Sequence, residues 1–394
     1  MKYYIIAGEA SGDLHGSNLI KELKQLDKAA DIRCWGGDLM EAAGGKVVKH
    51  YRDLAFMGFV EVVMNLRTIL SNLKFCKQDI AAFAPDVMIL IDYPGFNLRI
   101  AKWAKEAGLR VIYYISPQVW AWKESRVKGI KQWVDKMLVI LPFEKTFYQE
   151  RDYKVEYIGH PLVQVVAEAV QEKMGVPLRC TGPATEKTIE ITANEWEGKP
   201  LIALLPGSRK QEITVKLPVM LEAAKAFPDY QFIIAQAPGQ PLSFYQELTS
   251  SYQNVWIAVA GQTYTLLTKA CAALVTSGTA TLETALFGVP QVVCYKGSAL
   301  SYQIAKRLVK IKYISLVNLI MDKPVVKELI QNELTVSNIQ HALGAILHDE
   351  TRIGQMKADY GELKSILQKE GNASARAAQE IVGYLQATIA SKAG

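Results

Sequence analysis

Short apolar runs and segments with helical periodicity alternate along most of the chain, and this alternation limits the fold more than any other feature. The runs are rich in Val, Ile and Leu without a polar alternation, and amphipathic stretches such as Gly16–Leu26 and Leu98–Ala107 lie between them. Such runs are typical of parallel strands that helices cover on both faces. The pattern therefore predicts a doubly wound α/β protein. The expected strands are Tyr3–Ala7, Asp86–Asp92, Arg110–Ser116, Lys136–Ile140, Val155–Ile158, Leu201–Leu205, Gln231–Ala235, Ala273–Val275 and Gln291–Tyr295.

The alternation is interrupted once, between about Pro161 and Pro200, where Pro, Gly and charged residues gather and no clear period is visible. A chain of 394 residues is long enough for two or three domains. We therefore expect two Rossmann-like domains, residues 1–165 and 166–345, that face a cleft. Residues 346–394 are expected to form helices that pack back across the domains. Ligands of such sheets bind at the carboxyl ends of the strands.

Composition and charge exclude several classes of protein. Half of the residues are hydrophobic and 21% are charged, which excludes a disordered chain. The net charge of +6 is too small to indicate nucleic-acid binding. The five cysteines form no C-x-x-C pair, so neither a disulfide framework nor a zinc site is expected. The apolar N-terminal stretch is shorter than a signal peptide, and we expect a cytoplasmic protein.

The loops that follow the first-half strands carry two candidate sites. Gly8–Asp13 (Gly-Glu-Ala-Ser-Gly-Asp) opens a helix, whose first amides favour an anion or a polyol; a plain structural turn is the alternative. Asp92 ends a buried strand, where a carboxylate is well placed as a general base. Its alternative role is that of a turn or N-cap residue before the helix at Asn97.

Two loops of the second half combine small residues with charged ones. Gly207, Ser208 and Arg209 offer amides, a hydroxyl and a guanidinium to a phosphate, and Glu212 follows on the same helix. The Ser277–Ala280 segment opens a helix that carries Glu283, whose carboxylate can accept two ribose hydroxyls. A capped amphipathic helix is the alternative for this second segment.

Several common motifs are absent from the sequence. It has no Asp-x-Asp pair for a divalent metal on a diphosphate, no H-E-x-x-H, no G-x-S-x-G and no dinucleotide fingerprint. We therefore expect no metal and no cofactor. Amides, arginine and helix dipoles must then neutralise a diphosphate, which indicates a metal-independent nucleotide-sugar enzyme.

Ten short motifs together resemble the lipid-A-disaccharide synthase family, and Ser-Pro-Gln-Val-Trp-Ala-Trp at Ser116–Trp122 is the most specific of them. The resemblance extends from residue 3 to about residue 330, and the chain departs from the family pattern between about Gly175 and Lys199. The motifs are Gly8–Asp13, Met57–Val62, Asp92–Asn97, Ser116–Trp122, Leu141–Glu144, Gly159–Pro161, Leu204–Arg209, Ser277–Ala280, Lys306–Lys310 and Tyr313–Leu319.

The resemblance implies a GT-B glycosyltransferase. It would condense UDP-2,3-diacylglucosamine with 2,3-diacylglucosamine 1-phosphate to the β(1→6) disaccharide 1-phosphate and UDP. The acceptor would bind the N-terminal domain and the donor the C-terminal one. By motif, Asp92 matches the base, Arg209 the essential arginine, and Glu9 a further catalytic position. We expect the substrates to contact Ser11, Gly12, Asn97, Gly207, Ser208, Glu212, Ser277, Gly278, Thr279, Ala280, Glu283 and Asn318.

The stereochemistry of the implied reaction determines its mechanism. An α-linked donor that gives a β-linked product requires a single in-line displacement, with one base and a stabilised leaving group.

Two alternative functions are to be tested. A UDP-N-acetylglucosamine 2-epimerase would share the fold and the UDP site. A non-catalytic UDP-sugar or lipid-binding protein is the second alternative.

An apolar stretch, Leu54–Phe75, is expected to form a helix with only a thin polar line. Burial in the core is one interpretation, and contact with acyl chains or the bilayer edge is the other. Because both implied substrates are diacylated, we expect peripheral attachment to the cytoplasmic face of the inner membrane, and we also consider a homodimer. The residues expected to contact acyl chains or membrane are Phe56, Met57, Val60, Val63 and Met64.

Overall fold

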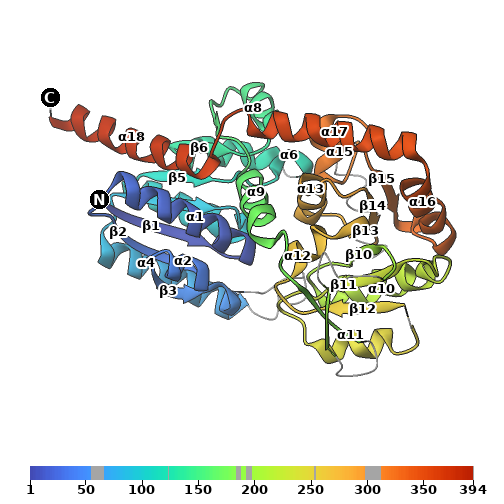
Figure 1. The fold of residues 1–394 in the computed structure, drawn as a ribbon. Helices are drawn as coiled ribbons and strands as arrows, with labels where there is room; N and C mark the ends of the chain where they lie inside the picture. Colours follow the sequence, from blue (N-terminus) through green and yellow to red (C-terminus); the bar gives the residue numbers. More distant parts are fainter. Residues whose placement is uncertain are drawn as a thin grey trace. The chain divides into compact units, whose positions relative to one another are not determined.

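The computed structural model describes residues 1–54, 66–122, 124–182, 188–191, 198–252, 254–297 and 312–393. The chain divides into two compact units, Met1–Pro161 with Leu367–Gly394 and Leu162–Ile366. Each unit holds one sheet with helices on its faces (Figure 1). The predicted doubly wound α/β class is confirmed.

The first unit is built on a parallel sheet in the order β3-β2-β1-β4-β5-β6-β7. Its strands are β1 (Lys2–Ala7), β2 (Asp31–Gly36), β3 (Lys46–His50), β4 (Val87–Ile91), β5 (Val111–Tyr114), β6 (Lys136–Val139) and β7 (Glu156–Tyr157). Its helices are α1 (Ala10–Leu26), α2 (Asp38–Ala42), α4 (Leu66–Phe83), α5 (Pro94–Glu106), α6 (Val119–Trp122), α7 (Val127–Trp133), α8 (Pro142–Gln149) and α18 (Ala373–Ala393). The last helix, α18, packs against α1 (Figure 1).

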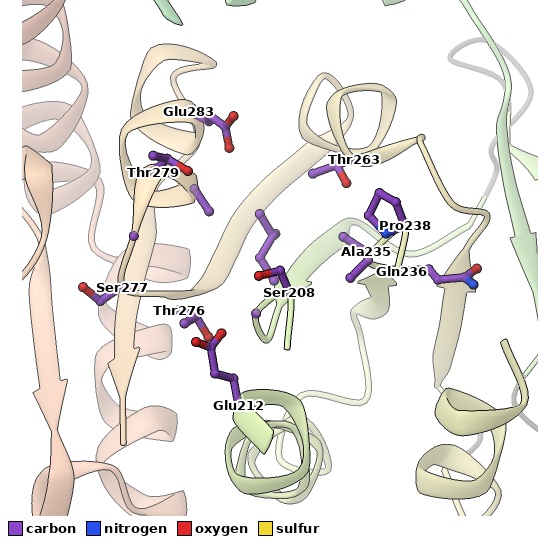
Figure 2. A pocket seen from close by; sticks show the side chains of 15 residues that line it. Ser208, Glu212, Ala235, Gln236, Pro238, Thr263, Thr276, Ser277, Thr279 and Glu283 are labelled. Atoms are coloured by element: carbon purple, nitrogen blue, oxygen red, sulfur yellow. The ribbon is translucent and has the colours of Figure 1, made fainter. Parts of the chain in front are cut away.

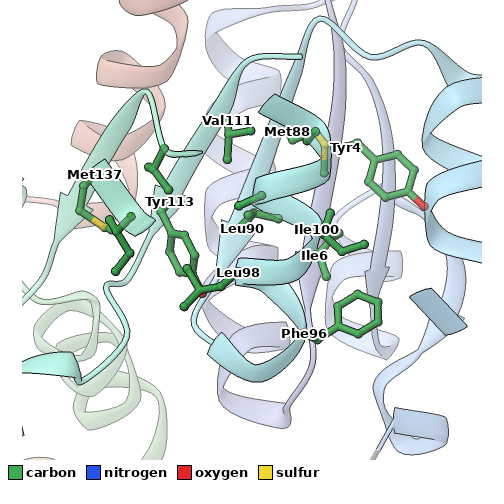
Figure 3. Close-up of a cluster of buried hydrophobic side chains, with 14 of the residues drawn as sticks. Tyr4, Ile6, Met88, Leu90, Phe96, Leu98, Ile100, Val111, Tyr113 and Met137 are labelled. Carbon is green, nitrogen blue, oxygen red and sulfur yellow. The ribbon is translucent and has the colours of Figure 1, made fainter. Parts of the chain in front are cut away.

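The core of this unit explains why its central strands are continuous apolar runs. All five residues of β4 are buried, because α-helices cover both faces of the sheet. Figure 3 shows the cluster that β1, β4, β5 and α5 form on one face. Each large apolar side chain buried there contributes roughly 1.5–3 kcal/mol. The polar ends inside it are paired, since the Trp35 indole donates to the Tyr4 hydroxyl at 2.9 Å.

The second unit is built on a sheet in the order β15-β14-β13-β10-β11-β12-β8-β9. Its strands are β8 (Leu178–Thr181), β9 (Thr188–Ile191), β10 (Leu201–Leu205), β11 (Gln231–Ala235), β12 (Val255–Ala258), β13 (Ala270–Thr276), β14 (Gln291–Tyr295) and β15 (Lys327–Ile330). Its helices are α9 (Pro161–Lys173), α10 (Lys210–Ala224), α11 (Leu242–Thr249), α12 (Thr263–Leu267), α13 (Thr279–Leu286), α15 (Leu316–Met321), α16 (Val336–His348) and α17 (Glu350–Gln368).

The fold departs from the sequence expectation in several places, since β2, β3, β12 and β15 were not expected as strands. Residues 178–191, which were expected to be a connection without sheet structure, carry β8 and β9, an antiparallel pair at the edge of the second sheet. Both strands have only four residues, and Arg179 pairs with Glu190 at 2.8 Å on the exposed side. Such short strands with alternating polarity lack the continuous apolar run by which the buried strands were predicted.

The apolar stretch Leu54–Phe75 is only partly described. Helix α4 begins at Leu66 and continues to Phe83, past the expected end. The expected membrane-contact residues Phe56, Met57, Val60, Val63 and Met64 lie outside the described residues. Among the described helices, none is long and apolar enough to cross a membrane.

Candidate active site

The topology of each sheet has one switch point, where successive crossovers change direction. In the first unit it lies between β1 and β4, whose carboxyl ends lead into Glu9 and Asp92. In the second unit it lies between β10 and β13, which lead into Gly207 and Ser277. Open α/β sheets bind their ligands in the crevice at such a point. The topology thus places residues that the sequence singled out at both switch points.

A cavity of about 260 Å³ lies at the switch point of the second unit. Figure 2 shows Thr279 and Glu283 on one side of the cavity and Pro238 on the other. Glu212 extends toward the cavity from helix α10, which lies below it in the view. The sequence-predicted residues that line the cavity are Gly207, Ser208, Glu212, Ser277, Gly278, Thr279, Ala280 and Glu283. The structure therefore brings together two loops that lie about 70 residues apart in sequence.

Two glycines shape the loops that line this cavity. Gly207 has a φ of +123°, and a Cβ there would lie 2.5 Å from Oε2 of Glu212. Gly278 has a φ of +152° and is the N-cap of α13, so the first turn of α13 lines the cavity. The first amides of a helix have no intrahelical partner, and they favour an anion.

Glu283 lies on α13 and is held by a tyrosine. The Tyr264 hydroxyl donates to Oε1 of Glu283 at 2.8 Å. Burial raises the pKa of Glu283, and the hydrogen bond from Tyr264 opposes the rise. The polar partner that a carboxylate on an apolar helix requires is thus present. Because Glu283 also lines the cavity, its carboxylate is placed to accept hydroxyl groups there.

Part of the cavity wall was not predicted from the sequence. The segment Ala235–Pro238, after β11, and Thr263, at the start of α12, complete the lining. The Ala237 amide donates to the Tyr245 hydroxyl at 3.0 Å, which holds this loop on α11. The signal was the Gln-Ala-Pro-Gly sequence directly after a predicted strand, next to the switch point in the sheet.

At the other switch point, Asp92 sits on strained backbone. Asp92 and Tyr93 have φ values of +43° and +47°, which non-glycine residues rarely adopt. The Asn97 side-chain amide donates to the carbonyl oxygens of Asp92 at 2.8 Å and Ile91 at 3.1 Å, and the Tyr113 hydroxyl also donates to the Asp92 carbonyl. Strain of this kind persists only where the surroundings enforce it, and it gathers at functional sites.

The charge of the Asp92 carboxyl is set by burial and by Glu9. Burial, and then the nearby Glu9 carboxylate, raise the pKa of Asp92 to about 7. A general base works best when its pKa lies near the working pH. The alternative role as an N-cap is not observed, because the N-cap of α5 is Tyr93.

Glu9 itself is the N-cap residue of α1, at the carboxyl end of β1. Gly8 allows the two loops to meet, since a Cβ there would lie 2.3 Å from the Tyr93 ring. Two carboxyl groups thus lie at the switch point of the first unit, and a cavity that favours an anion lies at that of the second. A carboxyl group of this kind suits proton transfer, and the amides of the cavity suit a phosphate.

The sequence profile of the family described as lipid-A-disaccharide synthetase matches residues 3–382. The chain belongs to this family. The lipid-A-disaccharide synthase of Geobacter metallireducens is 38% identical over 373 residues, with 93% of each chain covered. That of Syntrophus aciditrophicus is 39% identical over 374 residues, with 94% of each covered. The protein is therefore a glycosyltransferase, as the resemblance implied.

Solved structures confirm the GT-B type of fold for this synthase-family chain. A UDP-GlcNAc 2-epimerase from Neisseria meningitidis bound to UDP-GlcNAc has a TM-score of 0.67 at 14% identity, covering 97% of this chain and 100% of its own. The calicheamicin glycosyltransferase CalG4 has a TM-score of 0.58 at 16% identity, with 98% of each covered. At such identities the likeness shows the fold alone, so the epimerase alternative gains no support beyond it.

The structure also places three further residues from the family motifs. Arg209 is the N-cap residue of α10, with its Nη1 3.6 Å from Oε1 of Glu212, and it is not among the residues that line the cavity. Asn318 is buried, and its side chain exchanges two hydrogen bonds with the backbone of Val326, each 2.9 Å long. It therefore joins α15 to the start of β15 rather than lining the cavity. Ser277 donates to the Ile314 carbonyl at 2.9 Å.

The Gly8–Asp13 motif of the synthase family has at least one structural residue. Asp13 is buried and accepts hydrogen bonds from the amides of Gly37 at 2.7 Å, Leu39 at 3.2 Å and Met40 at 3.1 Å, so it caps α2. Gly12 packs against Ala7, and Ser11 is exposed. The structural interpretation thus applies to Asp13, and binding of a substrate by the rest of the motif stays a prediction.

Proposed function

We propose that this chain transfers 2,3-diacylglucosamine from UDP to the 6-hydroxyl of 2,3-diacylglucosamine 1-phosphate. The products are the β(1→6) lipid A disaccharide 1-phosphate and UDP. The observation that carries the proposal is membership of this family, and the buried Asp92 carboxyl, whose pKa is raised to about 7, suits a base at neutral pH. A carboxyl group with an ordinary pKa would be a weaker base for a hydroxyl.

The donor half of the reaction is assigned to the cavity of the second unit. Glu283 accepts hydrogen bonds from the ribose hydroxyls, while the first amides of α13 and the Gly207–Ser208 loop meet the diphosphate. Arg209, at the start of α10, neutralises charge that develops on the leaving UDP. Loss of a contact of this kind typically costs roughly 3–4 kcal/mol of barrier.

The acceptor half is assigned to the first unit. Asp92 takes the proton of the 6-hydroxyl as its oxygen attacks the anomeric carbon and the bond to UDP breaks. This single displacement inverts the α-linked donor to a β-linked product, so no covalent intermediate and no second base are needed. Asn97 and Tyr113 hold the Asp92 backbone in the strained geometry that aims the carboxylate.

The test measures UDP release from the purified full-length chain with donor and acceptor together and with each alone. We expect rapid release only with both, and no change on addition of EDTA. Release with the donor alone would indicate hydrolysis and contradict the proposal. Conversion of UDP-N-acetylglucosamine alone to its manno epimer would favour the epimerase alternative instead.

Attachment to the membrane surface is the second part of the proposal. Both substrates carry two acyl chains, and each buried CH₂ is worth about 0.8 kcal/mol of membrane binding, so they reside in the bilayer. Helix α4 supports the idea, because its Leu70 and Phe75 side chains are 61% and 43% exposed. Large exposed apolar residues next to the apolar stretch 55–65 suit a surface that meets acyl chains.

A further inference from the structure

Lys216 on α10 has an unusual environment. It is 2% exposed and is the one buried lysine or arginine among the described residues. In the described part of the chain its ammonium makes no hydrogen bond and no ion pair. Its Nζ is not among the fully buried side-chain atoms that have no partner, so the burial is mainly that of its aliphatic stem. The proposed reaction assigns no role to this lysine.

Three charged residues follow one face of α10 and become progressively more buried. Arg209, Glu212 and Lys216 are spaced three and four residues apart, which brings them onto one side of the helix. Their exposed fractions fall from 55% at Arg209 and 31% at Glu212 to 2% at Lys216. Helical side chains lean toward the helix N-terminus, so the Lys216 ammonium points toward Glu212 and the carboxyl edge of the sheet.

The charged groups near Lys216 are consistent with a side chain that leans toward Glu212. Burial lowers the pKa of Lys216, while Glu212 and then Cys294, near the end of β14, raise it and Arg209 lowers it further. Of the charged groups that act on the pKa of Lys216, the Glu212 carboxylate favours the charged ammonium most, although the two do not form an ion pair within 4.0 Å. Because the Lys216 side chain is shielded from solvent, salt screens the attraction between Lys216 and Glu212 less than it screens an exposed pair.

Glu212 presents a difficulty for the proposed donor site. Its carboxylate lines the cavity, with Oε2 close to Gly207, where a diphosphate is expected. Two negative groups in one cavity repel each other. Arg209 lies 3.6 Å from the same carboxylate, but it is half exposed, and exposed ion pairs contribute little. A second positive charge, on a residue that is better shielded from solvent, would offset the repulsion.

We propose, on the basis of the proposed function, that Lys216 is a positioning residue whose ammonium is the counter-charge of Glu212, four residues before it on the same helix face. Lys216 thereby lets a cavity with a carboxylate in its wall accept a nucleoside diphosphate. It acts on the diphosphate charge through Glu212, and not on the base or ribose. Its contribution therefore appears in the affinity for UDP and is absent from the affinity for uridine.

The test is calorimetric titration of the full-length chain with UDP and with uridine. We expect Lys216→Met to weaken UDP about tenfold and uridine less than about twofold. Adding Glu212→Gln to Lys216→Met should restore UDP binding, because the charge that needed compensation is gone. Lys225→Met is the matched control, since Lys225 is exposed on the same helix and pairs with Glu222 at 2.9 Å.

The outcomes separate this inference from the proposed function. If the wild-type chain does not bind UDP, both are wrong. If it binds UDP and Lys216→Met binds it equally well, only the inference is wrong. Equal losses for UDP and uridine, or no recovery with Glu212→Gln, also overturn it, since both indicate a structural role. Lys216→Gln replaces the Met variant if circular dichroism shows that the latter is unfolded.

Discussion

At the scale of single residues, the proposed site contains carboxyl groups whose pKa is raised by burial. The Asp92 carboxyl lies beside Glu9 on strained backbone, and its pKa is raised to about 7. Ionising such a group costs the folded state free energy at every pH above the ordinary range of a carboxyl. As the proposed base, Asp92 thus lowers the stability of the folded state while its pKa lies near neutrality.

Asp92→Asn should abolish turnover and leave UDP affinity unchanged, because the amide keeps the shape and cannot accept the proton. The raised pKa also means that ionised Asp92 destabilises the fold above pH 7, so the variant should melt no lower than the wild type at pH 8. UDP release and thermal melting check both parts. Turnover at the wild-type rate would remove Asp92 from the mechanism.

The pH dependence of the wild type follows from the same pKa. Only the ionised carboxylate can take a proton, so kcat/KM should rise with pH through about 7 and then level off. Glu9→Gln removes a neighbouring negative charge, which lowers the pKa of Asp92 and moves this rise to lower pH. Glu106→Gln, on the exposed far end of α5, is the control. An unshifted profile in Glu9→Gln would separate Glu9 from the base.

At the scale of secondary-structure elements, the proposed donor site depends on the two loops after β10 and β13. Each turns on a glycine with positive φ, and each leads directly into a helix whose first turn borders the cavity. The strand, the turn and the helix start must all be in register for the amides to converge. Loop conformation, more than any single side chain, therefore sets the affinity for an anion there.

Gly207→Ala tests this dependence on loop conformation. At φ of +123° a Cβ is strained, and it would lie 2.5 Å from the Glu212 carboxylate, so the loop must shift. Strain of this kind costs roughly 1–3 kcal/mol, and we expect UDP affinity to fall at least tenfold by calorimetry. Gly344→Ala, in helix α16 with no atom within 4 Å of the added Cβ, should bind UDP normally. Equal binding by Gly207→Ala would show that the loop is not part of the donor site.

At the scale of the whole molecule, the sequence predicted the continuous apolar strands better than the strands that carry charged residues. Strands β10, β11 and β14 occur at the expected residues, because helices on both faces require continuous apolar runs. Strands β2, β3 and β15 were missed because charged residues interrupt their apolar runs, and the four-residue strand β12 was missed as well.

The candidate site was likewise predicted only in part from the sequence. The sequence identified the switch-point loops because glycine and small polar residues follow predicted strands there. It did not identify the Ala235–Pro238 wall, the hydrogen bond from Tyr264 to Glu283 or the burial of Lys216. These depend on which strands become neighbours and on side-chain packing, and neither is visible in the local pattern of residues.

The last prediction concerns attachment of the full-length chain to membranes. With a net charge of +6, the chain should bind anionic vesicles at low salt and be released at about 1 M salt, where the Debye length is only about 3 Å. Leu70→Ser, combined with Met57→Ser and Val60→Ser, should weaken binding and raise KM for vesicle-borne acceptor, with turnover of detergent-solubilised substrate unchanged. Met174→Ser is the control, because Met174 is 70% exposed in the second unit. Vesicle sedimentation measures the binding. Wild-type chain that stays in solution with anionic vesicles at low salt would show that the substrates reach the site without membrane attachment.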